Sequence, residues 1–195
     1  MINDEQQGLI KRLKSRETGA FELLIEKHQT SIYNLVYRML GNTEEAEDLV
    51  QEVFITVFKQ IHNFRGDSSL GTWIYRIASN HCINRKKYLA RRKHYNKRSY
   101  FDLEDKDQPA NGAGDIHGQL PRPDEMAEGL QMERIMQKAI SSLDEEQRLV
   151  LVLRDIQNLS YEQIEDIVGV PSGTIKSRLH RARMNLKEKL SPNLR

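Results

Sequence analysis

The sequence predicts an all-α protein made of two small helical domains joined by a flexible polar linker. First, apolar residues recur at helical spacing over most of the chain, and no alternating strand pattern is present. Second, the 11 glycines and 5 prolines leave long stretches free of helix breakers. Third, helical spacing stops at about residue 99, where a segment begins that holds Asn-Gly-Ala-Gly and Leu-Pro-Arg-Pro. We therefore expect domains over 1–98 and 126–195, with a linker over 99–125.

Three helices are expected in the N-terminal domain. Apolar residues recur at helical spacing over 21–39, and again over 50–61. Thr43 is expected to cap the second of these helices. Residues 64–69 are rich in turn formers and predict a loop. The third helix is expected to start near Leu70 and to continue into a basic block around 85–93.

The C-terminal domain is expected to contain four helices, at 132–143, 145–156, 161–168 and 174–190. The last two are joined by a short turn with helix-start and helix-stop signals on either side. Their residues predict a helix-turn-helix, the fold unit that places its second helix in the major groove of DNA.

The turn itself is the most specific local feature of the sequence. Ser160 suits an N-cap, and Gln163 follows three residues later, as a capping box requires. Gly169 can adopt the positive φ of a tight turn, and Pro171 prevents the first helix from continuing. Ser172 is expected to cap the second helix.

The second helix of this pair is expected to read DNA. Its inner stripe consists of Ile175, Leu179, Ala182, Leu186 and Leu190. Lys176, Ser177 and His180 face away near its N-terminus and are candidates for base contacts. Arg178, Arg181 and Arg183 flank them and suit phosphate oxygens. The alternative is a solvated basic helix on an ordinary bundle.

Charge is arranged in blocks, although the net charge is only +2. Residues 43–52 and 101–107 are acidic, whereas 85–98 and 174–189 are basic. Two basic surfaces of this kind are typical of a protein that binds a polyanion. Cys82 is the only cysteine, which excludes an internal disulfide and a thiolate zinc site, and we expect it to be buried.

The loop at 64–69 and the helix that follows it could hold single-stranded nucleic acid. Aromatic rings stack on bases, amides read base edges and arginines hold phosphates. The helix offers these groups at Trp73, Tyr75, Arg76, Asn80 and Asn84. We expect Trp73 to belong to the core, and Tyr75, Arg76 and Asn80 to be exposed.

The acidic stretch at residues 43–52 cannot bind DNA. Asp48, Gln51, Glu52 and Ile55 lie away from the apolar stripe of their helix. A solvated helix face is one interpretation, and a docking surface for a basic partner is the other. The exposed isoleucine favours docking.

These motifs together resemble the extracytoplasmic-function sigma factors of bacterial RNA polymerase. Residues 47–54 are similar to the polymerase-binding helix of that family, 64–80 to its promoter-melting segment, and 160–183 to its reader of the minus-thirty-five element. Three motifs in the family's order are more specific than a helix-turn-helix alone. The resemblance implies an alternative sigma factor, containing the second and fourth conserved sigma domains, that acts in an envelope or other stress response.

The resemblance also implies a role for particular residues. Core polymerase would be bound, at the clamp helices of its largest subunit, by Asp48, Gln51, Glu52 and Phe54. The minus-ten element would be bound by Phe64, Arg65, Gly66, Asp67, Ser68, Arg76, Asn80, Asn84, Lys86 and Lys87. The minus-thirty-five element would be bound by Ser172, Thr174, Lys176, Ser177, Arg178, His180, Arg181 and Arg183.

The resemblance to this family further implies particular binding partners. Core RNA polymerase (clamp helices and flap), promoter DNA and an anti-sigma factor are the expected partners, and no cofactor or metal is expected. The acidic stretch 102–125 would run toward the RNA exit path. With no signal peptide and no long apolar run, we expect a cytoplasmic protein that does not insert into a membrane.

Two other classes of binding protein remain as alternatives. A conventional helix-turn-helix regulator would bind duplex DNA without polymerase, usually as a dimer, but the N-terminal half shows no dimerisation seam. A helical adaptor that binds RNA or acidic proteins would not need the capped turn at 169–172. An enzyme is the least supported class, because the six histidines are scattered and no phosphate-binding glycine loop is present.

Overall fold

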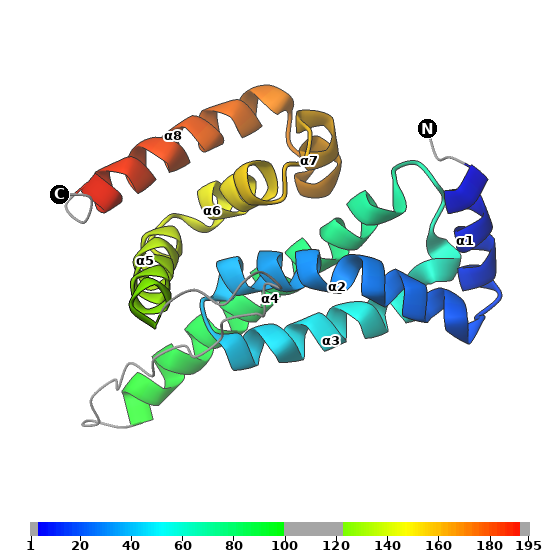
Figure 1. Cartoon of the computed structure of the whole chain (residues 1–195), viewed down its shortest axis with the longest axis horizontal. Helices are drawn as coiled ribbons and strands as arrows, with labels where there is room; N and C mark the ends of the chain where they lie inside the picture. Colours follow the sequence, from blue (N-terminus) through cyan, green and yellow to red (C-terminus); the bar gives the residue numbers. More distant parts are fainter. Residues whose placement is uncertain (1–3, 100–122, 192–195) are drawn as a thin grey trace.

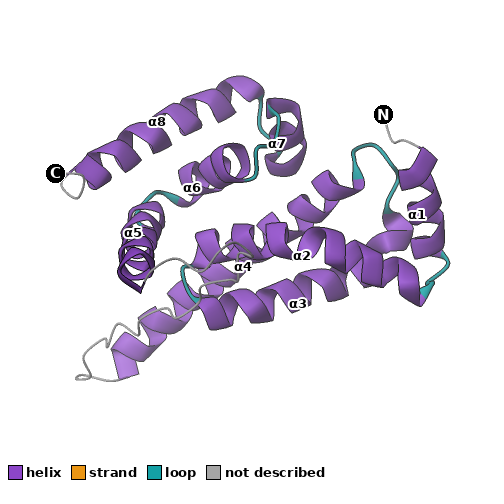
Figure 2. Ribbon diagram, viewed as in Figure 1, coloured by secondary structure: helices purple, strands orange, loops and turns teal. Residues whose placement is uncertain are grey.

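The fold follows the helical spacing of the sequence closely. A computed structural model of the chain describes residues 4–99 and 123–191. Every regular element in these two ranges is a helix, and neither range contains a strand (Figure 2). The predicted all-α class is therefore confirmed. The expected linker falls mostly at residues 100–122, outside the described ranges.

The N-terminal part is a bundle in which α2 and α3 run side by side and α4 packs against both (Figure 1). Its elements are α1 (Asp4–Lys14), α2 (Thr18–Leu40), α3 (Thr43–Gln60), the 3-10 helix η1 (Ile61–Asn63) and α4 (Leu70–Ser99). The three predicted helices are present, and α4 does continue into the basic block. Helix α1 was not predicted, because few of its residues are apolar, but Leu13 is fully buried and anchors it.

The C-terminal part contains the other predicted helices. Its elements are α5 (Pro123–Ser141), α6 (Glu145–Leu151), the π-helix η2 (Val152–Ile156), α7 (Tyr161–Val168) and α8 (Ser172–Leu190). The expected helix at 145–156 is present as α6 and η2 in succession. Helix α5 begins at Pro123. Residues 123–125 are therefore helical, although they were expected to belong to the linker. Proline is well suited to a first helical position, where its missing N–H is not needed.

Two expected helix caps are wrong by one residue. Asn42, not Thr43, caps α3, since its side chain accepts a hydrogen bond from the Glu45 N–H at 2.9 Å. Asn is at least as good a cap as Thr. Ser172 is the first residue of α8, and its cap position is occupied by Pro171, which makes no side-chain cap bond.

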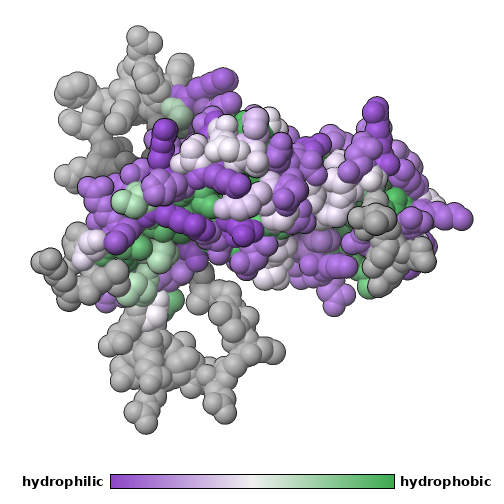
Figure 3. Space-filling view, turned by 90° about the horizontal axis from the view of Figure 1, so that it is seen from above, coloured by the Kyte–Doolittle hydropathy of each residue, from purple (hydrophilic) through white to green (hydrophobic). Residues whose placement is uncertain are grey.

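The core is a cluster of buried side chains that includes residues from both parts of the chain. Leu24, Leu35 and Ile74 are fully buried in the N-terminal part, and Leu153 and Ile164 in the C-terminal part. The face shown in Figure 3 is mostly hydrophilic, with hydrophobic residues in small patches between the charged ones. Burial therefore explains both the inner stripe of each helix and the position of the parts against each other.

Candidate nucleic-acid and partner interfaces

The helix-turn-helix forms as its residues predict. The Ser160 Oγ accepts from the Gln163 N–H at 3.2 Å, and the Gln163 Oε1 accepts from the Ser160 N–H at 2.9 Å, which completes the capping box. Gly169 ends α7 with a φ of 69°. A residue with a Cβ would be strained there, and Pro171 then allows α8 to start in a new direction.

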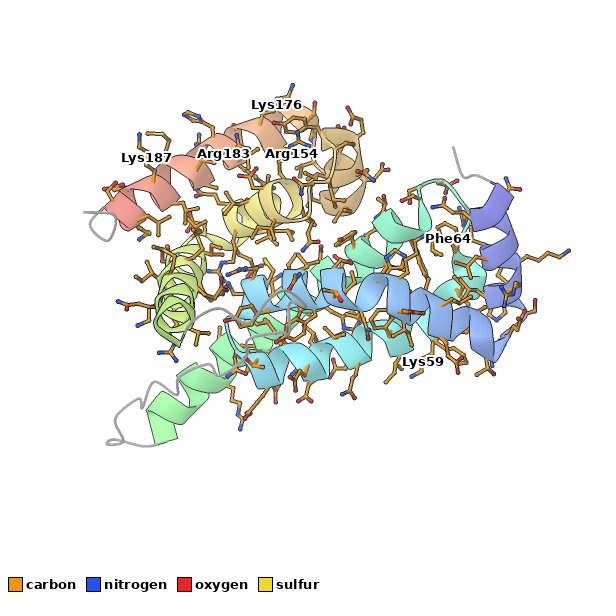
Figure 4. The ribbon with its side chains drawn as sticks, viewed as in Figure 1. Lys59, Phe64, Arg154, Lys176, Arg183 and Lys187 are labelled. Atoms are coloured by element: carbon orange, nitrogen blue, oxygen red, sulfur yellow. The ribbon has the colours of Figure 1, made fainter. Side chains whose placement is uncertain are left out.

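Helix α8 separates a buried from an exposed face. Ile175, Leu179 and Ala182 are buried, and Leu186 and Leu190 are half-buried. The opposite face carries the predicted base readers, and Lys176, Ser177 and His180 are all exposed. Figure 4 shows Lys176, Arg183 and Lys187 spaced along this helix. The predicted division of the helix into packing and solvent faces is therefore confirmed.

The predicted phosphate contacts on α8 are not equivalent in the structure. Arg178 forms an ion pair with Glu146 at 2.6 Å, and its side chain is only 23% exposed. Arg183 forms an ion pair with Asp155, also at 2.6 Å. Among the described residues no partner is found for Arg181, whose side chain is exposed. Arg181 is thus the arginine of this helix that needs no rearrangement before it can bind a phosphate.

A cation cluster at the start of α7 was missed in the sequence. The Arg154 guanidinium lies 4.8 Å from the centre of the Tyr161 ring, and the Lys176 ammonium lies 5.4 Å from it. Arg154 also donates to the Leu159 carbonyl at 2.6 Å. Arg154 stands within an apolar helix, and its closeness to Lys176 depends on the turn between α7 and α8. Tyr161 therefore holds two positive charges beside the exposed face of α8.

The loop before α4 encloses a polar cavity. Gly66 has a φ of 85°, and the Phe64 and Trp73 rings pack with their centres 5.3 Å apart. A cavity of about 210 Å³ is lined by Asn63, Phe64, Arg65, Gly66, Asp67, Ser68, Trp73, Arg76 and Asp166. Most of the predicted minus-ten set thus comes together at one place, beside the N-terminus of α4.

The prediction that Tyr75 on α4 is exposed is wrong. Only 8% of this residue is exposed, and its hydroxyl donates to the Gln157 Oε1 at 2.8 Å. Burial raises the pKa of this hydroxyl. The partner, Gln157, belongs to the C-terminal part, so the sequence near Tyr75 carried no sign of it. Arg76 and Asn80 are exposed, as predicted.

The residues in the basic stretch of α4 differ in their exposure and in their interaction partners. Asn84 and Lys87 are exposed, whereas Lys86 is half-buried, and burial and the nearby Arg148 cation lower the pKa of its amine. Arg85 forms ion pairs at 2.6 Å with both Glu45 and Glu52 of α3. Arg85 therefore ties α4 to α3, while Asn84 and Lys87 remain on the surface.

The acidic face of α3 is exposed as predicted. Asp48, Gln51 and Glu52 are exposed, and Ile55 is 52% exposed. Phe54 is half-buried and packs against the core, so it offers a partner less surface than Ile55. Isoleucine 55 was recognised as exposed in the sequence but was not among the residues assigned to polymerase binding.

Other kinds of site find no support in the described residues. Cys82 is fully buried, and burial raises the pKa of its thiol to about 12, so it is not a reactive thiolate. Within residues 4–99 and 123–191, no cluster of histidine, cysteine and carboxylate side chains could hold a metal ion. None of the helices in these ranges is long and apolar enough to span a membrane.

Comparison with known proteins identifies the class. Residues 24–93 match the family model "Sigma-70 region 2", and residues 133–186 match "Sigma-70, region 4". The cavity and α4 lie within or beside the first match, and the helix-turn-helix lies within the second. The fold and these surfaces define a sigma factor of the sigma-70 type.

Individual relatives show which group of sigma factors the chain belongs to. The RNA polymerase sigma-H factor of Pseudomonas aeruginosa is 34% identical, over 100% of this chain and 99% of its own length. The ECF factor SigW of Bacillus subtilis is 34% identical (93% and 94% covered), and the ECF sigma-E factor of Escherichia coli K12 is 33% identical (97% and 96%). The chain belongs to the extracytoplasmic-function sigma factors, which direct RNA polymerase to promoters.

Two solved structures share the fold. The sigma factor RpoE of Bartonella quintana, in complex with the anti-sigma factor NepR, is 24% identical with a TM-score of 0.65, covering 88% of this chain and 96% of that one. CnrH, in complex with the cytosolic domain of CnrY, is 18% identical with a TM-score of 0.69, covering 97% and 99%.

Proposed function

We propose that this sigma factor binds core polymerase through α3, reads the minus-thirty-five element with α8, and traps an unpaired minus-ten base beside α4. The observation that carries this proposal is the placement of three chemically different exposed surfaces on one chain. An acidic face lies on α3, a polar cavity lies beside α4, and a cationic face lies on α8. Each lies within or beside a segment that matches a sigma-70 region.

The polymerase contact would be made by Asp48, Gln51 and Glu52, together with Phe54. Their carboxylates suit a basic partner surface, and the exposed Ile55 beside them adds an apolar contact. Glu52 is already paired with Arg85, so Asp48 is the carboxylate of this set that is freer to bind a cation.

The minus-ten contact would centre on the cavity lined by residues 64–68. Arg65 and Asp67 are exposed at its rim, and Trp73 and Phe64 supply aromatic surface in its wall. Asn80, Asn84 and Lys87 extend the polar surface along α4. A flipped base costs a few kcal/mol of unstacking, which attachment at several places on the DNA and polymerase would offset.

The minus-thirty-five contact would be made by Lys176, Ser177 and His180 at base edges, with Arg181 on phosphate. Ser172 and Thr174 stand at the helix N-terminus, where free N–H groups favour an anion. Arg154 adds a positive charge near the same place and is a further candidate for a phosphate contact.

The chain would act by binding, and polymerase would supply the chemistry of transcription. We propose a cytoplasmic place of action and a role in an envelope or other stress response. An anti-sigma partner is also proposed. One structural neighbour, RpoE, was solved in complex with the anti-sigma factor NepR, and the other, CnrH, in complex with the cytosolic domain of CnrY.

In-vitro transcription of a fragmented genomic library from the source bacterium tests this function. Core polymerase alone is compared with core polymerase plus this protein. New, discrete transcripts that require the protein are the expected result, and their aligned upstream sequences give the promoter. Binding to duplex fragments without any new transcript would instead support a conventional helix-turn-helix regulator.

A further inference from the structure

One arginine of α4 holds a carboxylate of the proposed polymerase-binding face. Helices α3 and α4 pack against each other in the N-terminal part (Figure 1). The Arg85 guanidinium pairs with the Glu52 Oε1 through one terminal nitrogen and with the Glu45 Oε2 through the other, both at 2.6 Å. The two glutamates are about two helical turns apart, so they lie on the same face of α3. Arg85 therefore bridges two carboxylates of one helix.

The three side chains of this bridge differ in exposure. The Arg85 side chain is only 19% exposed, whereas that of Glu52 is 50% exposed. Arg85 is therefore largely covered, while Glu52 remains accessible to a partner protein. A carboxylate has acceptor positions on both oxygens, and Arg85 uses one of them, on Oε1. Glu52 can thus still accept a hydrogen bond from polymerase, in a position that Arg85 sets.

A histidine on the preceding turn of α4 also faces Glu52. The His81 Nδ1 lies 4.0 Å from the Glu52 Oε2, and the His81 Nε2 lies 3.1 Å from the Thr56 Oγ1. The Thr56 hydroxyl donates its single hydrogen to the Glu52 main-chain carbonyl at 2.8 Å. The His81 Nε2 must therefore be the donor to Thr56. When His81 is neutral, its Nδ1 then carries no hydrogen and presents a lone pair to the carboxylate.

Arg85, and not His81, therefore fixes the Glu52 carboxylate at neutral pH. Burial lowers the pKa of the His81 imidazole, and the Arg85 cation lowers it further, against the opposing effect of Glu52. His81 is thus uncharged at neutral pH, and its Nδ1 does not attract a carboxylate. The two Arg85 contacts are charge-assisted, and such hydrogen bonds are about twice as strong as neutral ones.

We propose that Arg85 is a positioning residue for the polymerase contact: it holds Glu52 in the geometry that core polymerase binds, without touching polymerase itself. The proposal rests on the function proposed above and adds a residue to that same site. A glutamate without such a partner has to be ordered when polymerase binds, which costs affinity. Arg85 stands in the basic stretch between Asn84 and Lys86, but it serves the polymerase-binding face and not the DNA strand.

Binding of the full chain to immobilised core polymerase from the source bacterium tests this role. Arg85→Ala should weaken the affinity about fivefold, as expected when one flexible side chain must be ordered on binding. Removing the arginine also leaves more negative charge facing a basic partner. The measurement is therefore made at about 0.3 M salt, where attraction between exposed charges is largely screened. Arg85→Lys keeps the charge but lacks the planar fork, so it should recover part of the affinity.

A double-mutant cycle shows whether Arg85 acts through Glu52. Glu52→Gln should weaken polymerase binding by itself, and Arg85→Ala should cost almost nothing more in that background. The matched control is Arg92→Ala, which removes the same charge from an exposed position about two turns further along α4 and should bind as the parent does. Thermal unfolding checks that every variant is folded.

A second readout uses the free chain and needs no polymerase. An NMR titration follows the ring signal of His81, which is assigned by its loss in a His81→Asn variant. In Arg85→Ala the pKa of His81 should rise, because the nearby cation that lowers it has been removed. In Arg92→Ala this pKa should stay where it is in the parent. The titration therefore reports whether Arg85 stands beside Glu52 and His81 in solution.

Several results would overturn the positioning role and leave the proposed function standing. They are an unchanged or higher polymerase affinity in folded Arg85→Ala, a full further loss when Arg85→Ala is added to Glu52→Gln, and an equal loss in Arg92→Ala. An unchanged His81 pKa in Arg85→Ala would overturn the role too, because the cation would then not stand beside this cluster. A parent chain that does not bind core polymerase at all would instead reject the proposed function, and the positioning role with it.

Discussion

Asn80 is a single side chain on which the opening step should depend. It is exposed on α4, where it lines a cavity of about 160 Å³ together with Ser79 and Ile83. Asn80→Ala removes an amide that can read the edge of an unpaired base, so promoter opening should fall while initial binding is retained. Permanganate footprinting of the polymerase complex measures the bubble. A bubble of normal extent in the variant would remove Asn80 from the base-trapping site.

Residues on α8 should divide into those that read sequence and those that add affinity. Lys176→Ala and His180→Ala remove exposed side chains near the helix N-terminus and should change the preferred upstream sequence. Arg183→Ala and Arg181→Ala should weaken binding to all sequences alike, and more so for Arg181, because Arg183 is partly held by Asp155. Selection from a randomised upstream element, with polymerase present, measures both effects. Unchanged preference after both Lys176 and His180 substitutions would contradict the assignment.

At the scale of one element, α7 depends on its capping box. Ser160→Ala removes the acceptor for the Gln163 N–H and should cost about 1 kcal/mol of folding free energy, which lowers the melting temperature by roughly 2–4 °C. Ser172→Ala is the matched control, since Ser172 is the first residue of α8 and its side chain caps nothing. Its melting temperature should stay close to that of the parent. Differential scanning calorimetry compares the two, and equal losses would mean that the capping box is not what stabilises the turn.

On the scale of the whole molecule, DNA affinity should depend on polymerase. The free chain exposes its cationic α8, and Arg76 donates to the Asp166 carbonyl in the wall of the proposed minus-ten cavity. We expect weak binding of free protein to a promoter duplex, with affinity that falls steeply as salt is raised. Bound to core polymerase, the same chain should bind much more tightly, because several weak contacts then act together. Fluorescence anisotropy over a salt series measures this, and equally tight binding by the free chain would contradict it.

Features whose interacting residues lie near one another in the chain could be predicted from the residues alone. The helix-turn-helix was predictable because Ser160, Gln163, Gly169 and Pro171 lie within one short segment and act on their own backbone. The exposed faces of α3 and α8 were predictable because helical periodicity places each side chain relative to the buried stripe. Local physics is enough for both, and the match to sigma-70 regions falls on the same segments.

The partners of charged and polar side chains in distant segments could not be predicted, because the fold brings those segments together. Tyr75 is buried because Gln157 accepts from it across 82 positions of the chain, and Arg148 reaches the Met39 carbonyl across 109. Arg183 is tied to Asp155, 28 positions away. No local pattern reports such partners, because a guanidinium that binds DNA and one that binds a neighbouring carbonyl look alike in sequence. The physical reason is that hydrogen bonds and ion pairs depend on distance in space, which chain folding sets and sequence spacing does not.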